Sequence, residues 1–105
     1  MSDARSAVLA RALALSHRVL EAAEQSDLAT VSLLDGERMR LLKSARADRA
    51  PMSEADQRMI AEVAALNDRA IGAMEHQRRS KERDLDMAAV GRRAVAAYAQ
   101  NAARR

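Results

Sequence analysis

Few side chains in this sequence have the types and spacing that chemistry at a site would need. His17 and Glu21 are one helical turn apart, so a helix would place both on one face, where they suit a shared metal ion. A metal site needs further ligands, and the sequence offers no second pair of an acid and a histidine at this spacing. We therefore interpret His17 as a surface or partly packed histidine. His76 stands among polar and charged neighbours and is interpreted as solvated.

The other chemical motifs are missing from the sequence. It contains no cysteine, so it has no thiolate nucleophile, no thiolate metal ligand and no disulfide. It also lacks a glycine-rich phosphate loop and a histidine paired with a nucleophile. We therefore expect a protein that is not an enzyme and that binds no cofactor and no metal.

Basic residues gather in the second half of the chain and allow a different function. The run from Gln77 to Arg83 is basic, but Glu82, Asp84 and Asp86 oppose its charge, whereas phosphate binding favours unopposed charge. Four arginines and no acid follow Asp86, in a chain with a net charge of +3. A basic helical regulator that binds a transcription factor or nucleic acid therefore stays open as the alternative function.

The composition predicts an all-α fold in one domain. The chain has 105 residues, of which 25 are alanine, with one tyrosine, no phenylalanine and no tryptophan. Strand-favouring residues are scarce, and three glycines with one proline provide few turns. We expect an antiparallel bundle of three long helices, the third being the longest, plus a short C-terminal helical segment. No apolar run is long enough to span a membrane and no export signal is recognised, so we expect a cytoplasmic protein without membrane insertion.

Apolar residues at helical spacing predict where the helices lie. The expected ranges are residues 3–25, residues 28–46 and a long helix that starts at Ser53, after a loop containing Pro51. The apolar stripe of the third helix consists of Met59, Ile60, Val63, Leu66, Ala70, Ile71 and Met74. We assign residues 1–86 to the bundle and residues 87–105 to a basic C-terminal segment of the same domain, in which Gly91 marks a helix end or hinge.

Three motifs in order resemble the FliT-type flagellar export chaperones. They are ALALSHRVLEAAEQSDLATVSLLDGERMRLL, then APMSEADQRMIAEVAALNDRAIGAMEHQRR, then GRRAVAAYAQ, which together span most of the chain. The resemblance implies a small cytoplasmic helical bundle that binds the C-terminal helical segment of the filament cap protein, FliD. It further implies that the chaperone prevents premature self-assembly of the cap protein and delivers it to the flagellar type III export apparatus.

The same resemblance implies further partners. Relatives contact the export ATPase, its FliJ-like stalk and the gate protein FlhA, and in some bacteria they bind the flagellar transcription activator. The tyrosine of the family that docks on the gate falls on Tyr98, the only aromatic residue of the chain. From its position alone, Tyr98 is either such a docking anchor or a residue that folds back onto the bundle.

A thin core of alanine and aliphatic residues leaves apolar surface for a partner. The methionines and alanines either pack as ordinary core residues or form a soft surface that adapts to an apolar helix of a partner. Self-association into a homodimer would cover the same surface. We predict that the client segment lies in a groove along the second and third helices. The predicted groove residues are Val31, Leu34, Val63, Leu66 and Ile71.

Overall fold

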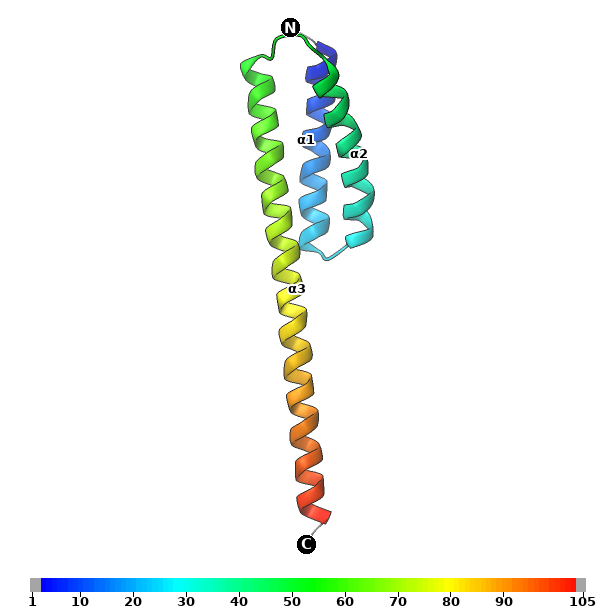
Figure 1. Ribbon diagram of the computed structural model, residues 1–105, viewed down its shortest axis with the longest axis vertical. Helices are drawn as coiled ribbons and strands as arrows, with labels where there is room; N and C mark the ends of the chain where they lie inside the picture. The colour runs from blue at the N-terminus through cyan, green and yellow to red at the C-terminus, as the bar shows by residue number, and fades with distance from the viewer. Residues whose placement is uncertain (1–2, 104–105) are drawn as a thin grey trace. The chain divides into compact units, whose positions relative to one another are not determined.

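Residues 3–103, which the computed structural model describes, form three helices and no strand. They are α1 (Asp3–Glu24), α2 (Leu28–Ala47) and α3 (Glu54–Ala103), of which α3 is the longest (Figure 1). The prediction of an all-helical chain with three helices is confirmed. The predicted starts and ends of α1 and α2 differ from the observed ones by one residue at most.

A tight turn ends α1 and a capping side chain starts α2. Ser26 has a φ of 58°, and the amides of Ser26 and Asp27 donate to the carbonyls of Ala23 and Ala22 at 3.1 and 2.9 Å. This is the Schellman pattern of helix ends, with serine at the position where glycine is usual. Asp27 then accepts hydrogen bonds from the hydroxyl and the backbone amide of Thr30, and these lower the pKa of the Asp27 carboxyl.

The chain divides into two units, Met1–Met74 and Glu75–Arg105. This division differs from the predicted boundary after Asp86. The predicted short C-terminal helical segment is not separate either, because α3 continues through Gly91 to Ala103 without interruption. A single glycine costs a helix about 1 kcal/mol, and the alanines on both sides of Gly91 favour the helix enough to offset it.

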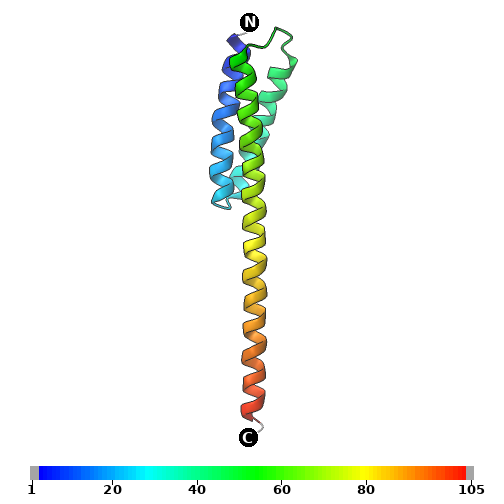
Figure 2. The ribbon, with the colours of Figure 1, turned by 90° about the vertical axis from the view of Figure 1, so that its left-hand side faces the viewer.

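The core of the first unit is built from the centres of the apolar stripes. The segments α1, α2 and residues 54–74 of α3 lie side by side in both views (Figures 1 and 2). The buried cluster consists of Leu15, Val19, Leu20, Ala23, Leu34, Leu66 and Ala70. Alanines in this cluster let the helix axes approach closely, and leucine and valine fill the remaining space.

A buried polar cluster joins the start of α1 to the connection between α2 and α3. Arg5 donates to the carbonyls of Asp48 and Pro51 at 3.1 and 2.7 Å, and its Nε lies 3.6 Å from Oδ2 of Asp56. Ser6 donates to the other oxygen of Asp56 at 2.7 Å. The side chains of Arg5 and Asp56 are each only 1% exposed. An arginine in the first turn of an amphipathic helix is expected to be solvated, and in this protein the pairing with Asp56 stabilises its burial.

A substitution at Gly36 tests whether the surroundings of α2 at this position are open. It is exposed in the middle of the helix, its φ is not positive, and a β-carbon added there would meet no atom within 4 Å. We expect Gly36→Ala to raise the free energy of unfolding by about 1 kcal/mol, measured by urea denaturation. Gly72→Ala in α3 meets the same open space and serves as the matched variant. A loss of stability in Gly36→Ala would contradict the described surroundings of α2.

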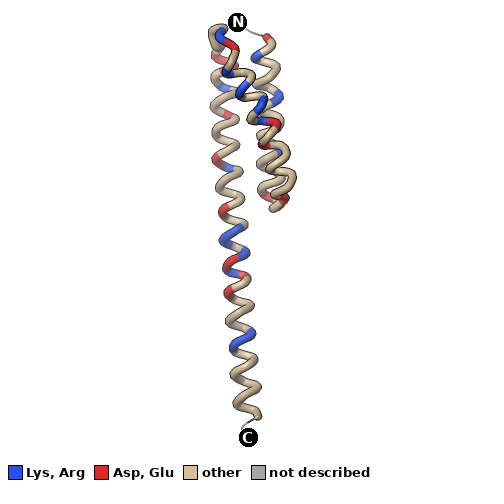
Figure 3. Tube along the Cα trace, turned by 45° about the vertical axis from the view of Figure 1, so that its right-hand side comes forward, with Lys and Arg blue, Asp and Glu red and all other residues tan. Residues whose placement is uncertain are grey.

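The second unit, residues 75–103 of the described chain, is a helix whose side chains are mostly exposed. Its first part carries charges of both signs, whereas its second part is mainly uncharged (Figure 3). Its large apolar side chains are exposed, and they are Leu85, Met87, Val90, Val95 and Tyr98.

Candidate binding groove

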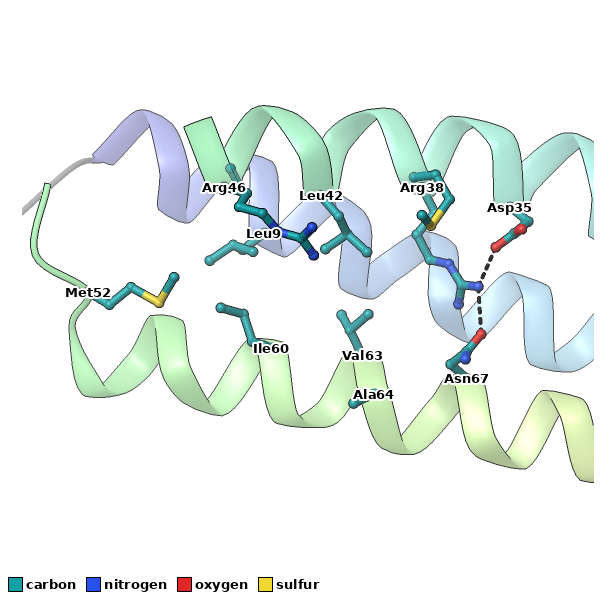
Figure 4. A pocket seen from close by; sticks show the side chains of 12 residues that line it. Leu9, Asp35, Arg38, Leu42, Arg46, Met52, Ile60, Val63, Ala64 and Asn67 are labelled. Atoms are coloured by element: carbon teal, nitrogen blue, oxygen red, sulfur yellow. Dashed lines mark hydrogen bonds and ion pairs between the residues drawn. The ribbon is translucent and has the colours of Figure 1, made fainter. Parts of the chain in front are cut away.

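The first unit contains an open groove between α2 and the first part of α3. Its volume is about 500 Å³, and Leu9 of α1 contributes to its lining. The lining residues are Leu9, Asp35, Arg38, Met39, Leu42, Ala45, Arg46, Met52, Ile60, Val63, Ala64 and Asn67, most of which are labelled in Figure 4.

The apolar lining comes from the edges of the helical stripes. Met39 and Leu42 are one turn apart on α2, and Ile60 and Val63 are one turn apart on α3. Met39 is 57% exposed and Ile60 is 36% exposed, so large apolar side chains face solvent along the groove. Met52, from the connection that precedes α3, adds a further flexible thioether side chain.

A polar bridge crosses one end of the groove. Arg38 is 5% exposed, and its Nη2 donates to Oδ1 of Asp35 and, at 2.8 Å, to Oδ1 of Asn67 on α3. Its Nη1 lies 3.4 Å from the hydroxyl of Ser16 on α1. Figure 4 shows the two dashed links that pass from Asp35 through Arg38 to Asn67. One buried guanidinium thus holds side chains of all three helices and fixes this end of the groove.

The groove differs in most residues from the predicted one. Of the predicted set, only Val63 lines it. Leu34 and Leu66 belong to the buried core, and Val31 is partly buried against that core. Ile71 is exposed on α3 but is not part of the groove lining.

The lining of the groove does not include Tyr98 or His17. Tyr98 belongs to the second unit and is 78% exposed, whereas all residues that line the groove belong to the first unit. His17 is exposed on α1. Within residues 3–103, no group of three histidine or acidic side chains is arranged to hold a metal ion.

The groove residues outside the predicted set share a weak sequence signal. Met39 flanks the stripe of α2 and Ile60 lies at the edge of the stripe of α3, and such positions line a groove when the stripe centres meet in the core. Arg46 and Asn67 are polar residues at the border of the apolar face, and their place at the groove depends on how the helices pack.

The lining of the groove suits the burial of an apolar surface. Apolar side chains form most of the lining, with a few polar groups at the ends, as is typical of sites that bury an apolar ligand surface. Between residues 3 and 103, no helix combines the length and apolar character needed to cross a membrane.

Comparison of the chain with family models, with curated proteins and with solved structures finds no match. The likeness to FliT-type chaperones therefore depends on the three sequence motifs alone.

Proposed function

We propose that this protein is a binding adaptor of the flagellar export-chaperone type, which captures an amphipathic helical segment of a client in the groove between α2 and α3. The observation that supports this most is the groove itself, in which exposed Met39, Met52 and Ile60 stand beside buried Leu9 and Val63. Exposed apolar side chains gathered in a concave site favour a partner that covers them.

A helical client fits the arrangement of the first unit. The contacts of Arg5 with Asp48 and Asp56 bring the start of α1 next to the end of α2 and the start of α3, which supports an antiparallel bundle of three helices. A fourth helix in the groove between α2 and α3 would complete a four-helix bundle, a common way to bury such a face.

The client proposed from the resemblance is the C-terminal segment of a flagellar filament cap protein. While the groove covers the apolar face of this segment, that face cannot pair with other copies of the cap protein, so the chaperone keeps the client unassembled. The proposed place of action is the cytoplasm, where the complex would meet the ATPase, stalk and gate of the export apparatus.

Calorimetric titration tests the proposed function. The full chain is titrated with a synthetic peptide of the cap protein's C-terminal segment and, separately, with duplex DNA at several salt concentrations. We expect micromolar or tighter binding of the peptide with a negative heat-capacity change, because apolar surface is buried. Failure of the peptide to bind, together with tight and steeply salt-dependent DNA binding, would replace the proposal with the alternative of a nucleic-acid regulator.

Tyr98 is the proposed docking residue for the export gate. Its ring is largely exposed and lies in a different unit from the groove. We expect Tyr98→Ala to weaken binding to the cytoplasmic domain of the gate about tenfold while client binding stays within twofold, because an exposed tyrosine is a frequent hot spot. Surface plasmon resonance with immobilised gate domain and client peptide measures both. Equal losses for the two partners would contradict this separation of roles.

A further inference from the structure

The two ends of the groove carry different charges. Asp35 and the bridged Arg38 are at one end, where the guanidinium of Arg38 is already shared between Asp35 and Asn67. Arg46 lines the groove two turns further along α2, about 12 Å from Arg38 along the helix axis. The groove thus has a cation at one end and a paired acidic group at the other.

Arg46 is an available cation. It is exposed, and within residues 3–103 its guanidinium makes no hydrogen bond or ion pair. Figure 4 shows its side chain reaching into the space lined by Leu42 and Ile60. A guanidinium at the edge of an apolar surface is partly desolvated when a ligand covers that surface, and it then forms stronger hydrogen bonds to a carboxylate than in water.

We propose that the groove is selective for an amphipathic helix of about two turns that carries an acidic side chain at its carboxyl end, where that side chain pairs with Arg46. This inference rests on the proposed function of the groove as a client-binding site. The carboxyl end of a helix carries a partial negative charge and its amino end a partial positive charge. The bound helix therefore lies with its carboxyl end at Arg46 and its amino end at Asp35, parallel to α2.

This direction agrees with the packing of neighbouring helices. A helix parallel to α2 runs antiparallel to the first part of α3, and antiparallel neighbours are common in helical bundles. The side chain of Asp35 is 45% exposed, so its carboxylate can face the amino end of the bound helix while it accepts from Arg38.

Two model peptides of identical composition test the selectivity. Each is a capped helix of about fourteen residues with leucines spaced three and four apart, and with one glutamate and one lysine placed about two turns apart, which matches the length of the groove. The first has glutamate at its carboxyl end and the second has it at its amino end. By the helix dipole alone, the second peptide forms the better helix, so tighter binding of the first cannot come from its own helicity.

We expect the peptide with glutamate at its carboxyl end to bind the full chain about tenfold more tightly, measured by fluorescence anisotropy. Arg46→Met keeps a long apolar side chain and should reduce this preference to about twofold or less. Arg40→Met, on the exposed face of α2 outside the groove, is the control and should retain the preference. Equal binding of the two peptides, no binding of either, or a preference that survives in Arg46→Met would overturn the proposal.

Two further outcomes distinguish the charge selectivity from the adaptor function. If the cap-protein peptide binds equally well to the unchanged chain and to Arg46→Met, the adaptor function stands and the charge selectivity falls. If the model peptides show the Arg46-dependent preference but the cap-protein peptide does not bind, the selectivity stands and the client assignment falls. Light scattering would detect a dimer. If dimer formation prevents both model peptides from binding, the groove is occupied by a second copy of the chain, and the inference is overturned.

Discussion

Asp56→Ala is expected to lower the free energy of unfolding by about 3 to 5 kcal/mol, because it breaks a buried pair of charges. The variant leaves the buried guanidinium of Arg5 without the carboxylate that is buried beside it, and the hydroxyl of Ser6 without this acceptor. A domain of this size has roughly 5 to 15 kcal/mol of stability, so a large share of it would be lost. Urea denaturation followed by circular dichroism measures the change.

The matched control for this prediction is Asp68→Ala. Asp68 is an exposed aspartate of the same helix with no hydrogen bond or ion pair among the described residues, so its removal should change stability by about 0.5 kcal/mol or less. The double variant Arg5→Met with Asp56→Leu should lose less than the sum of its two single variants, because no charge then stays buried alone. A loss below about 1 kcal/mol in Asp56→Ala would show that the cluster does not hold the connection to α3.

Ile60→Asp is expected to weaken client binding by about a hundredfold or more. Ile60 stands in the apolar lining with a third of its surface exposed, so a client helix in the groove would bury it. An aspartate at this position would have to lose its hydration against apolar side chains, which costs several kcal/mol, and about 2.7 kcal/mol already corresponds to a hundredfold. Calorimetry with the client peptide measures the effect.

Leu33→Asp is the matched control for Ile60→Asp. Leu33 is an even more exposed aliphatic residue, 73% exposed on α2, and it is not part of the groove. Its replacement should leave the client affinity within about twofold, because no contact is lost. If both variants are shown by circular dichroism to be folded and lose equal client affinity, the client binds on another surface.

Local signals were sufficient to predict the helices of the first unit. Helix α2 begins next to Ser26 and Asp27, and α3 begins next to Pro51 and Ser53. These helix-start signals depend only on residues within a few positions of the chain. Gly91 does not end the helix, because a single glycine weakens a helix without ending it when alanines within the same turns, such as Ala89 and Ala94, favour the helix.

The groove could be predicted only in part, because it depends on which part of each stripe meets the other helices. Leu34 and Leu66 occupy the stripe centres and are buried in the core, whereas Met39 and Ile60 lie at the stripe edges and stay exposed to solvent. Periodicity identifies the stripe but does not separate its centre from its edges.

Buried charged residues were the other limit of sequence-based prediction. Arg5 pairs with groups that are more than forty positions away in the chain, at Asp48 and Pro51. Nothing near Arg5 in the sequence distinguishes it from the solvated arginines of α1, since its burial is stabilised only after the helices have packed.

Methyl NMR of selectively labelled methionines tests the central claim most directly, because the methionines lie in different surroundings. Met39 and Met52 line the groove, whereas Met87 is exposed in the second unit. On titration with the client peptide, we expect the methyl signals of Met39 and Met52 to shift to saturation and that of Met87 to stay unchanged. Saturable shifts at Met87 with no change at Met39 and Met52 would contradict the assignment of the groove as the client site.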